Sequence, residues 1–131
     1  MKLELVDATG NGEYPLAIPA SLVRLTDFSD SEILDLISSI QTLVLEERKP
    51  LAIHNLSFIS SHSCEVTFQI CEEDRCLVPV GPGNEYVCFL TYGSFVGMLD
   101  ILRNVADGYN WLTPGEYLDE PAFLVSKWGT W

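Results

Sequence analysis

The sequence predicts an α+β fold in which two helices pack on a mostly antiparallel sheet of about seven short strands. The expected order is ββ-α-ββββ-α-β, over one domain of residues 1–131. Two segments place apolar residues three and four positions apart, as helices do, and several others alternate apolar with polar residues, as strands do. Short loops rich in turn residues separate the strand segments. Such loops favour antiparallel pairing, because parallel crossovers need about a dozen or more residues.

The N-terminal segment predicts a β-hairpin. Lys2–Val6 and Tyr14–Ile18 flank Asn11-Gly12, and Asn-Gly is the dipeptide most typical of tight hairpin turns. The apolar run Leu22–Leu25 follows Pro19. We expect this run either to extend the same sheet or to form a connector.

The first helix is predicted over Asp30–Arg48. Ser29 and Glu32 have the spacing of a capping box, in which each side chain accepts a backbone N–H of the other residue. An apolar stripe with helical spacing follows and is expected to face the core. Pro50 ends the helix, because proline has no N–H to donate and clashes with the preceding turn.

The middle of the chain predicts four strands in an antiparallel meander. Leu51–Ile59 is a largely apolar run, and Cys64–Ile70 alternates apolar with polar residues, which is the period of a half-buried strand. Cys76–Val80 and Glu85–Thr91 follow, separated by a loop that contains Gly and Pro. Short loops of this kind connect strands that pair antiparallel.

The four cysteines are Cys64, Cys71, Cys76 and Cys88. If residues 72–75 form a tight turn, Cys71 and Cys76 lie opposite one another across a hairpin, where a disulfide is geometrically conceivable. We favour the alternative that the thiols pack as small apolar side chains. The sequence contains no Cys-x-x-Cys pair or other zinc-ligand spacing, so we expect no metal and no cofactor.

The second helix is predicted over Ser94–Asp107, and a last strand over Ala122–Trp128. Ser94 is expected to cap the start of the helix. Gly108 suits the position after its last turn, where glycine adopts the left-handed conformation without a steric penalty.

The chain is strongly acidic, with a net charge of −12, although 47% of its residues are hydrophobic. The hydrophobic content excludes a disordered acidic tail, which combines high charge with low hydrophobicity. The charge argues against direct contact with nucleic acid or with an anionic membrane, because both attract clustered Lys and Arg. The N-terminal residues do not have the pattern of a signal peptide, so we expect a cytoplasmic location.

The sequence contains no catalytic motif, and we therefore expect the chain not to be an enzyme. His62 and Cys64 are two residues apart and could share one face of a strand. The sequence context of a Cys-His nucleophile is absent, however. A small enzyme or ligand-binding domain that uses these two residues is kept as an alternative.

Partner-binding residues are predicted in two acidic groups and at two aromatic anchors. The first group, at the expected hairpin tip, is Glu72, Glu73 and Asp74. The second group, near the second helix and the last strand, is Asp107, Glu116, Asp119 and Glu120. The anchors are Trp111 and Trp131, because tryptophan is enriched among the residues that dominate binding at protein interfaces.

Together these features predict a binding protein for a basic protein partner, present as a monomer or a homodimer. Electrostatic steering by such a charge can raise association rates roughly 10- to 1,000-fold. Nucleic-acid enzymes and toxins have positive clefts, so the most specific hypothesis is an immunity protein that neutralises a bacterial toxin. The alternatives are a nucleic-acid mimic, the small enzyme or ligand-binding domain, and an acidic accessory or structural domain.

Overall fold

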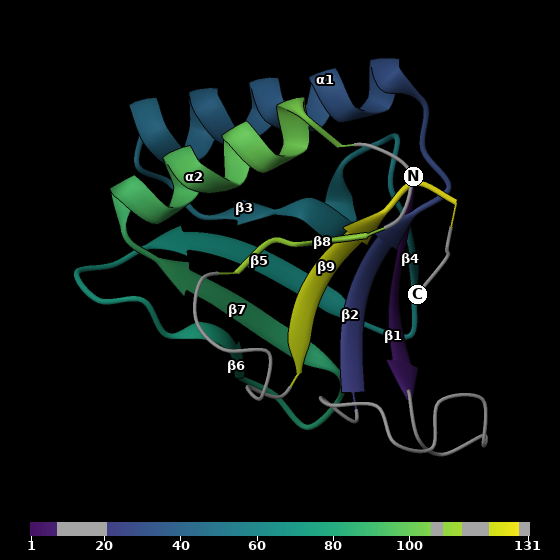
Figure 1. Ribbon diagram of the computed structural model, residues 1–131. Coiled ribbons are helices and arrows are strands. Elements are labelled where there is room, and N and C mark those ends of the chain that lie inside the picture. Colours follow the sequence, from purple (N-terminus) through teal and green to yellow (C-terminus); the bar gives the residue numbers. More distant parts are fainter. Residues whose placement is uncertain (8–20, 106–108, 114–120, 129–131) are drawn as a thin grey trace.

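Two helices lie together on one side of two β-sheets (Figure 1). The computed structural model describes residues 1–7, 21–105, 109–113 and 121–128, and these ranges contain two α-helices and nine strands. The fold is therefore α+β, as the hydrophobic patterns predict, with more strands than the seven expected. In the described ranges, no helix is long and apolar enough to cross a membrane.

The first sheet has the strand order β4-β1-β2-β9-β8. In that order its strands are Ser60–His62, Lys2–Asp7, Ser21–Thr26, Ala122–Ser126 and Asn110–Trp111. β1 pairs antiparallel with β2, and the apolar run Leu22–Leu25 thus extends the sheet. The predicted partner of β1, Tyr14–Ile18, lies outside the described residues. β2 brings three fully buried side chains into the sheet: Leu22, Val23 and Leu25. The Asn11-Gly12 turn motif does not predict this contribution, because strand preference depends on packing against neighbouring strands.

The second sheet has the strand order β3-β5-β7-β6. In that order its strands are Leu51–Ala52, Glu65–Ile70, Glu85–Leu90 and Cys76–Pro79. β6 and β7, which are joined by a short loop, pair antiparallel, but β5 and β7 pair in parallel. The pairs β1–β4 and β2–β9 are parallel as well. The prediction of a mostly antiparallel sheet is met only in part, because the loop rule describes only strands that are consecutive in the chain.

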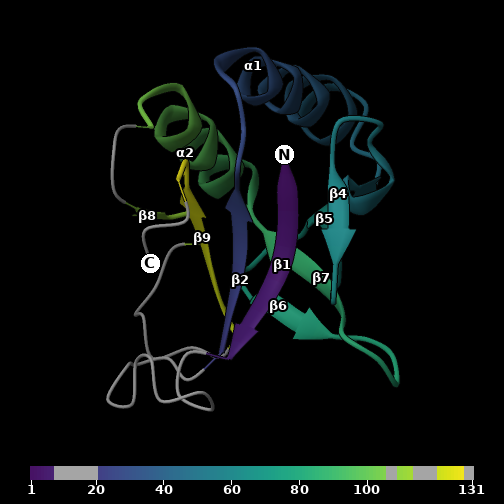
Figure 2. The same ribbon diagram turned by 90° about the vertical axis from the view of Figure 1, so that its right-hand side faces the viewer.

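The chain passes from one sheet into the other at the corner between β4 and β5 (Figure 2). Ser63 in this corner has φ 69°, in the left-handed region that is uncommon for residues other than glycine. Its hydroxyl accepts the Leu5 N–H at 3.1 Å, which ties the corner to β1. The start of β5 is thereby held close to the edge of the first sheet.

The predicted hairpin between Cys71 and Cys76 does not form, because β7 lies between β5 and β6. The intervening loop crosses the end of β7, where the Cys71 N–H donates to Leu90 O at 3.0 Å and the Arg75 N–H donates to Phe89 O at 2.9 Å. Cys71 is a free thiol, so the conceivable disulfide is absent.

The first predicted helix forms with the predicted cap. α1 (Asp30–Ser39) follows Ser29, whose hydroxyl accepts the Glu32 N–H at 3.2 Å while the Glu32 carboxylate accepts the Ser29 N–H at 2.9 Å. The capping box is therefore confirmed. The helix continues as the π-helical segment η1 (Ile40–Glu46) and ends close to the predicted Arg48.

The second predicted helix forms, but Ser94 is not its cap. α2 (Tyr92–Arg103) follows Thr91, whose hydroxyl accepts the Ser94 N–H at 3.2 Å. Ser94 thus lies within the first turn, because the strand before it already ends at Leu90. The helix ends before the predicted Asp107, and Asp107 and Gly108 lie outside the described residues.

Two predicted strands are shorter than expected. Within Leu51–Ile59, only Leu51–Ala52 pairs, as β3, before the chain turns into the short 3₁₀-helix η2 (Ile53–Asn55). β9 (Ala122–Ser126) ends before Lys127 and Trp128, which lie in a turn.

The core lies between the helices and both sheets. Phe68 on β5 is fully buried, with its ring centroid 5.7 Å from that of Phe95 on α2 and 5.9 Å from that of Phe123 on β9. A smaller buried cluster lies on the other face of the first sheet and consists of Leu22, Ala122 and Leu124, with Val6 and Trp111 packed against it.

Candidate functional site

The loop between β5 and β6 carries the first predicted acidic group. Glu72 and Glu73 are exposed. Asp74 is bound to the start of α2, because its Oδ1 accepts the Thr91 N–H at 2.9 Å and its Oδ2 accepts the Ser94 hydroxyl at 2.7 Å. Partial burial opposes ionisation of Asp74, but these hydrogen bonds outweigh it and hold its pKa below the ordinary value. Asp74 thus anchors the helix while remaining exposed, as Glu72 and Glu73 are.

The second acidic group falls entirely outside the part of the chain that the structure describes. Asp107, Glu116, Asp119 and Glu120 lie outside the described residues, as does Trp131. Trp111 on β8 is half-buried against the small cluster of the first sheet, and its ring meets that of Tyr109 edge-on at 5.7 Å. The most exposed tryptophan among the described residues is Trp128, at 63%, which is not among the predicted anchors.

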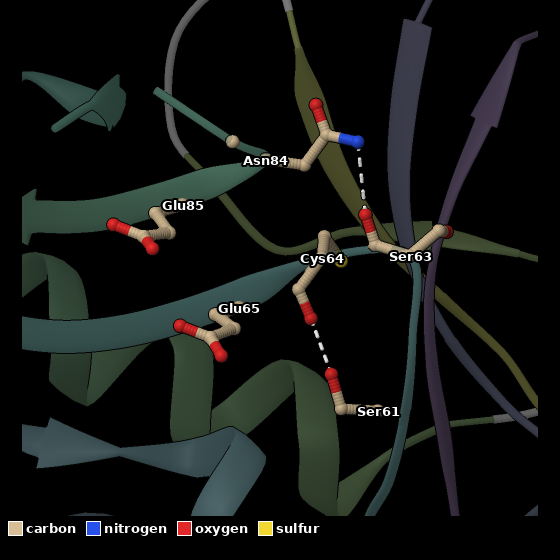
Figure 3. Close-up of a pocket in the computed structure, with 7 residues that line it drawn as sticks. Ser61, Ser63, Cys64, Glu65, Asn84 and Glu85 are labelled. Carbon is tan, nitrogen blue, oxygen red and sulfur yellow. Dashed lines mark hydrogen bonds between the residues drawn. The ribbon is translucent and has the colours of Figure 1, made fainter. Parts of the chain in front are cut away.

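A surface pocket of about 290 Å³ lies where β5 and β7 begin (Figure 3). Its lining consists of Ser61, Ser63, Cys64, Glu65, Gly83, Asn84 and Glu85. In the parallel register, Glu65 lies directly opposite Glu85, so the two side chains leave the same face of the sheet. Figure 3 shows both carboxylates projecting side by side from the neighbouring strands. The register therefore holds two negative charges together at the pocket.

Hydrogen bonds between the β4–β5 corner and the start of β7 maintain this register. Asn84 Nδ2 donates to Ser63 O at 3.0 Å, and the Glu65 N–H donates to Asn84 O at 2.9 Å. Gly81 leaves room for the Glu85 side chain, because a Cβ at Gly81 would lie only 2.1 Å from Glu85 Oε2. Any other residue at position 81 would therefore displace the Glu85 carboxylate.

Cys64 is buried at this pocket, and its chemistry reflects the surrounding charge. Burial, together with the negative charges of Glu4 and Glu65, raises the pKa of the Cys64 thiol to about 12. His62, the other half of the candidate nucleophile pair, is exposed on β4. A thiol that stays protonated at neutral pH is a poor nucleophile, which weighs against catalysis by this pair.

His54 lies close to Glu65, one of the residues that line the pocket. Its Nδ1 lies 3.1 Å from Val66 O and 3.2 Å from Val66 N. The ring thus bonds to the backbone of β5 at Val66, next to the residues that pair with β3. Its Nε2 lies 3.9 Å from Glu65 Oε2. Across the described part of the chain, no group of three or more His, Cys, Asp and Glu is arranged to hold a metal ion. The pocket instead offers paired carboxylate acceptors, which suit a guanidinium or an ammonium group.

Sequence reasoning missed Glu65 and Glu85 as site residues. The alternating pattern of Cys64–Ile70 does place Glu65 on the polar face of its strand. The two residues are brought together by the pairing of β5 with β7. The sequence pattern of either strand alone does not indicate which strand it pairs with.

Comparison with known proteins adds no relative to this picture. No protein-family model, no curated protein and no solved structure matches the chain.

Proposed function

We propose that the chain is an acidic binding protein that neutralises or regulates a basic protein partner, and that this partner is a bacterial toxin for which the chain is the immunity protein. The observation that supports it most directly is the Glu65–Glu85 pair at the pocket. Like charges directly opposite one another destabilise a sheet, so a cation from a partner gains two acceptors and relieves a repulsion. The net charge of −12 adds long-range attraction to the same class of partner.

The proposal includes a cytoplasmic location. Cys64, Cys71 and Cys88 are free thiols, which is the form that reducing compartments maintain. The alternative of a small enzyme has less support, because the Cys64 thiol remains protonated.

A pull-down with charge-reversed variants tests the proposal. Wild-type chain, Glu65→Lys/Glu85→Lys and a matched control, Asp35→Lys/Glu46→Lys, are immobilised and exposed to bacterial extract. The control reverses two exposed acidic residues on the helical side of the molecule. Extract is applied at about 50 mM salt and proteins are eluted with rising salt, which screens exposed charges.

We expect the wild type and the control to retain a basic protein that the pocket variant loses. If the wild type retains no basic protein at low salt, the proposal is wrong. Production of the retained protein in a bacterial host, with and without the chain, then tests immunity, because a neutralised toxin no longer arrests growth.

A second variant separates the pocket from the overall charge. Gly81→Ala leaves the net charge at −12 but forces the Glu85 carboxylate to move. We expect retention to weaken in this variant. Full retention by Gly81→Ala together with loss in the charge-reversed variant would mean that charge, and not the position of the pair, governs binding.

A further inference from the structure

The carboxylate pair lies at one end of a sheet face that is turned away from the core. In the sheet β3-β5-β7-β6, six of the residues on this side define what we call the open sheet face: Glu65, Thr67, Val78, Glu85, Val87 and Phe89. Val87 lies opposite Thr67 on one side and opposite Val78 on the other, so these three form a row across the sheet. Residues between them along β5, such as Phe68, point the other way and are buried.

The open sheet face remains partly exposed. Val78, Val87 and Phe89 are each half-buried. Val80, whose N–H donates to Glu85 O at 3.0 Å, has 54% of its surface exposed. The outer face of the first sheet differs, because Leu22 is fully buried there. Among the described residues, the apolar side chains on this face of the second sheet are therefore less buried than Leu22 on the outer face of the first sheet.

Acidic residues lie at both ends of this apolar surface. Glu65 and Glu85 stand where β5 and β7 begin, and the loop that follows β5 carries the exposed Glu72 and Glu73. β5 is six residues long, so the two acidic ends are roughly 16–20 Å apart. The face also carries one cation, Arg75, whose guanidinium lies 5.4 Å from the centre of the Phe89 ring.

We infer that the open sheet face is the surface on which the basic partner docks, and that the partner presents apolar side chains flanked by Arg or Lys. This inference rests on the proposed function. Apolar groups at the centre with charges at the rim are the usual arrangement of protein interfaces. A second copy of the chain is a poorer occupant, because its own carboxylates would meet those of the first.

A synthetic peptide with this chemistry tests the inference. The probe is the acetylated octapeptide Arg-Arg-Val-Thr-Val-Thr-Arg-Arg, titrated into ¹⁵N-labelled chain and followed by backbone amide shifts. Val80→Ser removes an exposed apolar side chain from the edge of the face. Leu34→Ser is the matched control, because Leu34 is 62% exposed on α1.

We expect saturable shifts confined to β5, β6 and β7. We also expect about three- to tenfold weaker binding for Val80→Ser, with unchanged binding for Leu34→Ser. Absence of peptide binding at low salt, shifts centred on α1, or equal weakening by both substitutions would overturn the inference. The proposed function would survive those results if the pull-down still retains a basic protein, so the two failures are distinguishable.

Discussion

Neutralising one member of the pocket pair is expected to stabilise the isolated protein. Glu65 and Glu85 face each other across parallel strands, which lie about 4.8 Å apart. Because the Glu65 side chain is 54% exposed, a water-like dielectric constant applies, and the repulsion at that distance is about 0.9 kcal/mol. Roughly half of it survives a Debye length of about 8 Å at physiological salt. Glu85→Gln should therefore raise the free energy of unfolding by roughly 0.5–0.9 kcal/mol, the larger value at low salt.

Urea unfolding of the wild type, Glu65→Gln, Glu85→Gln and the double variant measures this repulsion as a coupling energy. The second neutralisation should add little, because the first has already removed the repulsion. Glu73→Gln is the control, since Glu73 is exposed and has no carboxylate opposite it in the sheet registers. A coupling near zero at low salt, or a loss of stability in Glu85→Gln, would refute the reasoning. Binding of the proposed basic partner to Glu85→Gln should weaken, although the isolated variant is more stable.

Three further predictions concern stability and thiol reactivity. Asp74→Ala should lower the free energy of unfolding by about 1 kcal/mol, whereas Glu73→Ala should change it little. Because folding lowers the pKa of Asp74, urea titrations should show its contribution present above the ordinary carboxyl pKa of about 4 and lost as the pH falls through the lowered value. Thr26→Val should raise stability by about 1 kcal/mol in thermal unfolding, because the buried Thr26 hydroxyl has no hydrogen-bond partner among the described residues; a lower melting temperature would contradict this. Iodoacetamide should label Cys71 in the native protein before Cys64, as peptide mass spectrometry can show, and the reverse order would conflict with the burial and raised pKa of Cys64.

Features that depend on neighbours in the chain could be predicted. The capping box of Ser29 and Glu32 needs only a spacing of three residues, and it forms as expected. The alternation in Cys64–Ile70 likewise predicts β5 and which of its side chains are buried. Both rest on local geometry, so distant packing did not alter them.

Features that depend on contacts between distant segments could not be predicted. The apparent hairpin at Cys71 and Cys76 fails because β7, which comes later in the chain, lies between β5 and β6. Asp74 looks like a solvated tip residue until the loop is placed beside the start of α2. The Glu65–Glu85 pair likewise exists only in the register of β5 with β7, and a shift of one residue would place the two glutamates on opposite faces.

In the proposed complex, the total charge and the pocket pair act at different stages of binding. A charge of −12 attracts any basic protein over about a Debye length, so it raises the association rate without choosing among partners. The choice must come from contacts that only one surface can satisfy, and these mainly determine the dissociation rate. In the proposed complex, Glu65 and Glu85 fix where a cation of the partner sits, and the neighbouring Val80 and Val87 fix where its apolar group lies. A partner that meets both requirements is selected by geometry, which is why moving a carboxylate without changing the charge is the decisive perturbation.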